Sequence, residues 1–146
     1  MRILYFLSLT VVIVLAHCTS SSGAETLKSL EGVWQAEAFS ICGTNVTEPA
    51  KAAAVTTITN SQMIVDDGAN VYRIEFTTDT TVAPCEMDQT IEHDGKAYTS
   101  KCIYKREGNT LTIAGSMIPG GPRPKSFSPD QNSNLIVTSF RLLSTE

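Results

Sequence analysis

The sequence predicts an all-β fold: a single antiparallel up-and-down β-barrel, or closed β-meander, of about eight strands. From Gly32 onward, short runs rich in Val, Ile, Thr and Tyr alternate with turn residues, and no stretch keeps a helical spacing of apolar residues. Asp67-Gly68, Asp94-Gly95 and Gly108-Asn109 each lie between two alternating runs, as the turns of tight hairpins do. Such a barrel either fills its interior with side chains or holds one small ligand.

The expected strands follow these alternating runs. They are Val33–Ile41, Ala53–Thr59, Gln62–Asp66, Asn70–Thr77, Cys85–His93, Lys96–Arg106, Thr110–Ser116, Lys125–Ser128 and Leu135–Leu143. Only Glu25–Leu30 could hold a helical turn, and Pro119–Pro124 must be a loop because it consists of Pro, Gly and one Arg. With no internal repeat, residues 25–146 are expected to form one barrel domain.

The turn at Asp94-Gly95 predicts a register for its two strands. If His93 lies opposite Lys96, one face of the hairpin is nearly uncharged. Its pairs are Ile91 with Tyr98, Gln89 with Ser100, Met87 with Cys102 and Cys85 with Tyr104. The other face carries the charges, including Asp88 opposite Lys101. This separation is typical of a half-buried antiparallel pair.

The first strand carries the only tryptophan of the chain, Trp34. Under strict alternation Trp34 shares a face with smaller residues, namely Ala36, Ala38, Ser40 and Cys42. Small residues beside one aromatic side chain would leave room inside the barrel, with Trp34 as a plug. The turn at Gly108-Asn109 puts Tyr104 opposite Ile113 on the same inner face.

Residues 1–24 are expected to direct export. Met1–Ala16 starts with a positive charge and continues as an uncharged, mostly apolar run, shorter than the ~20 residues needed to span a bilayer. Two cleavage positions remain open. Leu15-Ala16-His17-Cys18 resembles a bacterial lipobox, in which Cys18 would carry a lipid anchor to the membrane. Cleavage after Ala24, which follows small residues, would instead release a secreted protein.

Composition excludes several classes of function. The formal net charge is −4 and no run is rich in Lys or Arg, so we expect no nucleic-acid partner. His93 is the only histidine outside the leader, and it stands beside a predicted turn. No nucleophile, base and orienting group can be assembled, and no Cys/His spacing fits a metal site. We therefore expect a monomer with no catalytic residues, metal or cofactor.

Three cysteines remain in the barrel domain: Cys42, Cys85 and Cys102. One disulfide and one free thiol is the simplest assignment in an oxidising compartment. Cys85 and Cys102 lie on one face of the predicted hairpin, one step diagonal to each other. Such neighbours are ~7–8 Å apart, so the ladder would have to twist to join them. We still expect this pair, because a bond from Cys42 requires more rearrangement.

Three segments resemble the lipocalin-like proteins of the calycin group, in particular bacterial lipocalin-like lipoproteins. They are Leu30-x-Gly32-x-Trp34, Tyr104–Ile113 and Phe140-Arg141-Leu142. The resemblance implies that Trp34 packs at the closed end of the barrel and that an arginine near the end of the chain stacks on it. Arg141 is the candidate for this cation–π contact. With the leader, it implies a protein of the periplasm or outer membrane, lipid-anchored or secreted.

The resemblance also implies a non-enzymatic protein that binds a small hydrophobic molecule inside the barrel. The polar-capable residues expected to line that site, with the tryptophan, are Trp34, Gln89, Tyr98, Ser100, Tyr104 and Arg106. A few such groups orient a ligand in an apolar pocket. Alternatively they satisfy one another in a filled barrel. A filled barrel would suit a protein-binding envelope factor, such as a calycin-like protease inhibitor.

Overall fold

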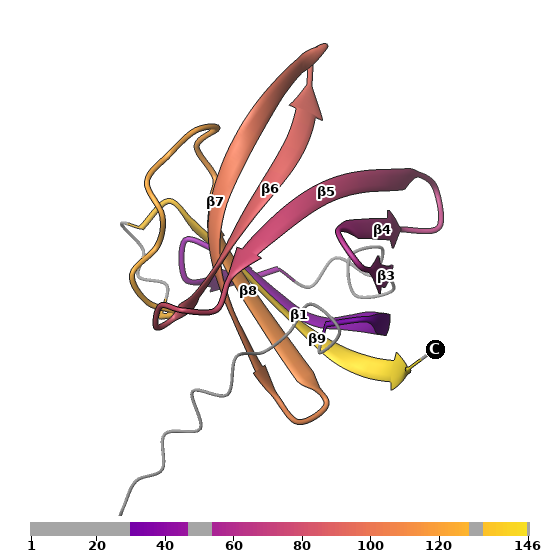
Figure 1. Ribbon diagram of the computed structural model, residues 1–146. Helices are drawn as coiled ribbons and strands as arrows, with labels where there is room; N and C mark the ends of the chain where they lie inside the picture. Colours follow the sequence, from indigo (N-terminus) through magenta and orange to yellow (C-terminus); the bar gives the residue numbers. More distant parts are fainter. Residues whose placement is uncertain (1–29, 47–53, 129–132, 146) are drawn as a thin grey trace, which may run out of the picture.

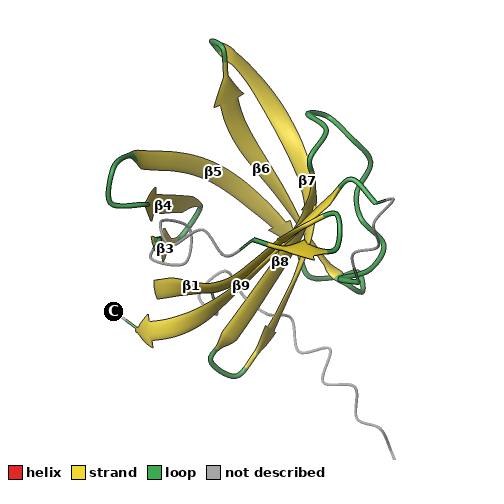
Figure 2. Ribbon diagram, turned by 180° about the vertical axis from the view of Figure 1, so that it is seen from behind, coloured by secondary structure: helices red, strands yellow, loops and turns green. Residues whose placement is uncertain are grey.

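The computed structural model describes residues 30–46, 54–128 and 133–145 of the chain (Figure 1). Within these ranges the protein consists of strands and loops without a helix, as Figure 2 shows. The strands are β1 (Gly32–Ile41), β2 (Thr44–Asn45), β3 (Val55–Thr59), β4 (Gln62–Asp66), β5 (Val71–Asp79), β6 (Cys85–His93), β7 (Lys96–Glu107), β8 (Thr110–Ser116) and β9 (Leu135–Ser144). The predicted all-β class is confirmed.

Eight of these strands form a closed antiparallel barrel. From β1 and β3 to β9 they follow one another in chain order, and β9 pairs back with β1. Trp34 of β1 lies opposite Thr56 of β3 on one side and Leu142 of β9 on the other. The ninth strand, β2, pairs with the end of β1. This is the up-and-down barrel that the spacing of short strands and turns predicts.

The hairpin registers predicted from the turns are also confirmed. In β6 and β7, His93 lies opposite Lys96, and all four predicted inner-face pairs form. Asp94 and Gly95 have φ angles of 51° and 71°. Positive φ at both turn residues matches the type I′ turn that suits a two-residue hairpin. Tyr104 of β7 lies opposite Ile113 of β8, as expected.

The β6–β7 hairpin extends beyond the other strands (Figure 1). β5 pairs with β6 only over Glu86–Thr90, and β8 pairs with β7 only over Cys102–Glu107. In the part of the chain that the structure describes, the tip from Ile91 to Tyr98 is therefore a two-stranded ribbon. The edge of β7 over Lys96–Lys101 has no pairing with β8.

Three local expectations differ from the structure. Lys125–Ser128 is not a strand but part of the connection from β8 to β9. The short β2 was not predicted. The turn at Asp67-Gly68 is a four-residue connection, Asp67–Asn70, in which Asp67 Oδ1 accepts hydrogen bonds from the backbone N–H groups of Ala69 and Asn70. The expected helical turn at Glu25–Leu30 lies outside the described residues except for Leu30.

β1 changes face at an irregularity between Ala36 and Ala38 in its pairing with β9. An extra residue at a bulge shifts the alternation of a strand. Beyond it, Phe39 lies opposite Thr138 and continues the inner face, whereas Ala38 is exposed. The expectation that Ala36, Ala38, Ser40 and Cys42 share the face of Trp34 is therefore wrong beyond Ala36.

The barrel interior is packed around Trp34. The main hydrophobic core contains side chains from all eight barrel strands, and its largest fully buried members are Trp34, Tyr104, Leu30, Ile58, Met87 and Leu111. The Thr56 hydroxyl is also buried here and has no hydrogen-bond partner in the described structure. Side chains therefore fill the barrel interior around Trp34.

A second apolar cluster lies on the outer wall. Ile103, Ala114 and Leu135 are buried there, and Phe127 and Val137 pack against them. Phe127 belongs to residues 117–128, which we call the strap. The Pro119–Pro124 loop is part of this strap, so the loop covers the outside of the barrel.

Candidate functional site

Trp34 and Arg106 seal one end of the barrel. Trp34 is fully buried, and its indole Nε1–H donates a hydrogen bond of 3.0 Å to the carbonyl oxygen of Leu30. The guanidinium carbon of Arg106 lies 5.2 Å from the centroid of the Trp34 ring, within cation–π range. Arg106 Nε–H also donates to the carbonyl oxygen of Gly108 at 3.0 Å, which orients the guanidinium. Trp34 therefore acts as a plug, as predicted.

The arginine that covers Trp34 is not the predicted one. Arg141 lies opposite Gln35, whose side chain points to the other face from Trp34. The Arg141 guanidinium is consequently outside the barrel, where its Nε–H donates to Glu37 Oε1 at 2.6 Å. The expectation that Arg141 stacks on Trp34 is corrected: Arg106 of β7 does so.

Gly32 lies where β1 and β9 approach each other closely. Its φ of 142° is rare for residues with a side chain. A Cβ atom there would lie 2.7 Å from the carbonyl oxygen of Ser144 and 2.9 Å from Leu142 Cδ1. Glycine thus permits the close approach of β1 and β9 where the barrel closes.

A small, partly open cavity of about 170 Å³ lies inside the barrel, away from the Trp34 plug. Its walls come from β4 to β9, and most of its lining is apolar, including Met63, Ile74, Ile113 and Phe140. Gln89, Cys102, Ser116 and Thr138 bring polar side chains to the wall, and no charged side chain lines it. This cavity is the candidate ligand site.

Gln89 is the notable polar group of this cavity, because only 9% of its surface is exposed. Its side-chain Nε2 lies 3.4 Å from Met87 Sδ and 3.6 Å from Met63 Sδ. Thioether sulfur is a weak acceptor. The amide therefore has weak partners in the described structure, although a buried amide normally has strong ones.

The six predicted lining residues do not form one site. Only Gln89 lines the cavity; Trp34 and Arg106 form the plug, and Tyr104 is buried in the core. Ser100 lies beside the cavity wall, with its Oγ 3.6 Å from Cys102 Sγ. Tyr98 is half-buried on the projecting hairpin, opposite Ile91.

Sequence reasoning missed Met63 and Phe140 as cavity residues. Each lies on an alternating strand, so its inward direction could be read from the pattern. Their meeting with Gln89 depends on the registers of β4 with β5 and of β9 with β1. A tight two-residue turn fixes the register of β6 with β7. No such turn joins β9 to β1, so the sequence does not predict their register.

The three cysteines do not form a disulfide in the structure. The expected pair, Cys85 and Cys102, stays diagonal because the β6–β7 register is regular: Cys85 lies opposite Tyr104 and Cys102 opposite Met87. The Cys102 thiol is buried over Gly115, whose added Cβ would lie 2.8 Å from Sγ. Burial raises the pKa of this thiol above its ordinary 9.0, which makes it a poor nucleophile.

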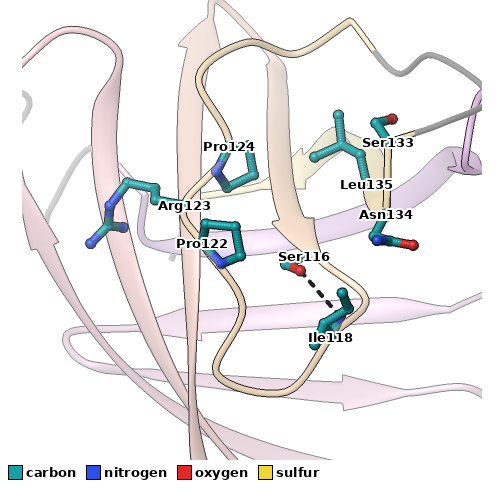
Figure 3. A pocket seen from close by; sticks show the side chains of 8 residues that line it. All are labelled: Ser116, Ile118, Pro122, Arg123, Pro124, Ser133, Asn134 and Leu135. Carbon is teal, nitrogen blue, oxygen red and sulfur yellow. Dashed lines mark hydrogen bonds between the residues drawn. The ribbon is translucent and has the colours of Figure 1, made fainter.

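A second cavity, of about 210 Å³, lies between the strap and the start of β9 (Figure 3). Figure 3 shows Arg123 pointing away from the other residues that line it. Its guanidinium instead contacts Glu86 Oε2 at 3.0 Å and Asp88 Oδ1 at 2.7 Å. It also donates to the carbonyl oxygen of Cys102 at 2.7 Å. Arg123 therefore fastens the strap to the outer wall.

Other site classes find no support among the described residues. In residues 30–46, 54–128 and 133–145, no three His, Cys, Asp or Glu side chains are grouped to hold a metal ion. No helix in these ranges has the length and apolarity to cross a bilayer. The leader and Cys18 lie outside the described residues.

No protein-family model matches the chain, and neither a curated protein nor a solved structure matches it significantly. The closed eight-stranded barrel is compatible with the calycin architecture.

Proposed function

We propose that the protein is an exported, non-enzymatic lipocalin-like protein that binds a small hydrophobic molecule in the cavity beside Gln89. The observation that carries this proposal is the buried amide of Gln89 in a partly open, mostly apolar cavity without charged side chains. Ligand sites combine apolar walls with a few polar groups that fix orientation. Arg106 and Trp34 plug one end of the barrel, so a ligand would enter from the other end.

The cavity volume limits the ligand to a small molecule. Sites for drug-sized ligands have volumes of about 300–1,000 Å³. This cavity has about 170 Å³, similar to the ~150 Å³ of an engineered apolar cavity that holds benzene. The ligand is accordingly of single-ring size, unlike the extended ligands that a large open barrel accommodates.

A cavity-filling variant tests this function. Ile74→Trp places a larger side chain in the cavity wall, whereas Val71→Trp adds the same group at an exposed position of the same strand. We expect toluene to bind the wild type and Val71→Trp in calorimetric titration and to lose at least tenfold affinity for Ile74→Trp. Equal affinity of toluene for all three proteins would contradict the proposal.

We also propose that the chain is exported and that Cys18 carries a lipid anchor, as in lipocalin-like lipoproteins. Two lipid signals or more are needed for stable anchoring, and a processed lipobox cysteine supplies several acyl chains. In a bacterial host, radiolabelled palmitate should label the wild type and not Cys18→Ser. Labelling of neither protein, with cleavage after Ala24, would indicate plain secretion.

A protein-binding envelope factor, such as a calycin-like protease inhibitor, is the second candidate. The projecting β6–β7 hairpin favours it, because the Lys96–Lys101 edge of β7 has no β8 partner among the described residues. Exposed strand edges accept extended peptides from other proteins. Inhibition of a purified protease by the mature chain, lost on deletion of residues 92–97, would support this candidate over ligand binding.

A further inference from the structure

We infer that the cavity ligand is a single-ring aromatic carboxamide whose amide pairs with the side-chain amide of Gln89. This inference rests on the proposed function and specifies the chemical class of its ligand. Three features of the cavity carry it: the position of the Gln89 amide, the lack of charge in the walls and the sulfur atoms around the amide.

The Gln89 amide is held inside the barrel by its place in the sheet. Gln89 lies in the middle of β6, opposite Phe76 of β5 and Ser100 of β7, so both edges of its backbone are paired. An inward-facing side chain in such a position cannot turn out to solvent without breaking the ladder. The amide therefore remains at the cavity wall whether or not a ligand is present.

The hydrogen-bonding capacity of this amide is largely unused. A glutamine amide offers two N–H donors and a carbonyl oxygen with two lone pairs. Within the described residues, the hydrogen bonds of Nε2 go to the sulfurs of Met63 and Met87, which are weak acceptors. A ligand that presents an acceptor beside a donor can satisfy both halves at once.

A carboxamide is the group that meets this requirement best. Two primary amides pair through two parallel N–H···O bonds, one in each direction. A half-turn of the Gln89 side-chain amide exchanges its nitrogen and oxygen, and the pairing still forms when the ligand amide turns with it. A carboxylate offers no donor, and its buried charge would have no cation in the cavity walls.

The atoms around Gln89 favour an aromatic ring on that carboxamide. The thioethers of Met63 and Met87 lie next to the amide, and the thiol of Cys102 and the ring of Phe140 line the same cavity. Sulfur atoms make favourable contacts with the edges of aromatic rings. The volume of about 170 Å³ admits one ring of this kind.

Calorimetric titration of the mature protein with four matched probes tests the inference. Benzamide carries ring and amide, toluene the ring alone, benzoate a charge, and cyclohexanecarboxamide the amide on a non-aromatic ring. We expect benzamide to bind at least tenfold more tightly than each of the other three. Toluene binding equal to or tighter than benzamide binding would overturn the carboxamide inference and leave the proposed function standing. Binding of none of the four would overturn both.

Substitution of Gln89 gives the second arm. Gln89→Leu keeps the approximate volume and removes the amide, so the preference for benzamide over toluene should vanish while toluene still binds. Gln62→Leu, on the outer face of β4, is the control and should keep the preference. If Gln89→Leu does not fold, NMR of the wild type replaces it: benzamide should shift the Gln89 side-chain amide resonances. Unshifted resonances at saturating benzamide would overturn the inference.

Discussion

Arg106 and Arg141 show how the direction of one side chain decides its role. Both are arginines on strands at the plugged end of the barrel, yet Arg106 faces inward over Trp34 and Arg141 faces outward beside Glu37. An exposed ion pair contributes about 0–1 kcal/mol, and a cation–π contact that shields a ring contributes about 0.5–2 kcal/mol. The two residues should therefore respond differently to substitution.

We predict that Arg106→Ala alters the environment of Trp34 and Arg141→Ala does not. Loss of the guanidinium uncovers the ring, so Trp34 emission should shift to longer wavelength and the free energy of unfolding should fall by about 1 kcal/mol. Arg141→Ala should leave emission unchanged and stability within about 0.5 kcal/mol. Fluorescence spectra and urea unfolding measure both effects. An emission shift with Arg141→Ala alone would restore the sequence-based assignment.

Cys102 gives a pH-dependent prediction. Burial raises the pKa of its thiol in the folded protein, so the unfolded chain loses this proton at lower pH than the folded one. The contribution of Cys102 to stability is full below the ordinary pKa of 9.0 and declines as the pH rises through the folded value. Unfolding free energies measured from pH 7 to pH 11 should fall less steeply for Cys102→Ala than for the wild type.

Cys42 provides the comparison for the burial of Cys102. Its thiol is partly exposed and contacts Met117 Sδ at 3.6 Å. Thiol reagents should modify Cys42 in the folded protein and reach Cys102 only after unfolding. Rapid modification of Cys102 under native conditions would contradict the burial argument.

At the scale of elements, the strap is the feature that strand periodicity cannot predict. Its segment Lys125–Ser128 has the composition of a short strand, but Phe127 packs on the outer cluster and Lys105 Nζ lies 5.4 Å from the centroid of its ring. Apolar contact with the wall replaces sheet pairing. A local pattern cannot distinguish these outcomes, because both bury the same side chain.

We predict that Arg123 holds the strap and has little effect on the barrel itself. Arg123→Ala removes contacts to Glu86 and Asp88 and a hydrogen bond to the sheet backbone. The free energy of unfolding should fall by about 1–3 kcal/mol, the usual range for bonds to charged groups, and trypsin should cleave faster at Lys125. Lys125→Ala supplies the control for the cleavage site. Unchanged cleavage kinetics would show that Phe127 alone fixes the strap.

At the scale of the whole molecule, the barrel differs from the projecting hairpin in strand pairing. Strands within the barrel have two neighbours, whereas the tip of β6–β7 has only its own partner strand in the described structure. Local opening requires less free energy where fewer contacts break. Stability should accordingly fall along β7 from the barrel to the tip.

Hydrogen exchange tests this gradient. We predict that backbone amides of Lys96–Lys101 exchange at least tenfold faster than those of Cys102–Tyr104, because the latter segment is paired with both β6 and β8. NMR or mass spectrometry with peptide resolution measures the difference. Uniform protection along β7 would indicate that another surface, such as a second copy or a protein partner, covers the hairpin edge.

The sequence alone determined the all-β class, the strands around the tight turns, and the inward direction of Trp34 and Gln89. These features depend on residues close in the chain, where turn chemistry and alternation act directly. Only the tertiary structure decided which arginine covers Trp34, where β1 changes face, and which side chains enclose the cavity with Gln89. These features depend on barrel closure, because the register between β9 and β1 joins residues about a hundred positions apart and no local turn specifies it.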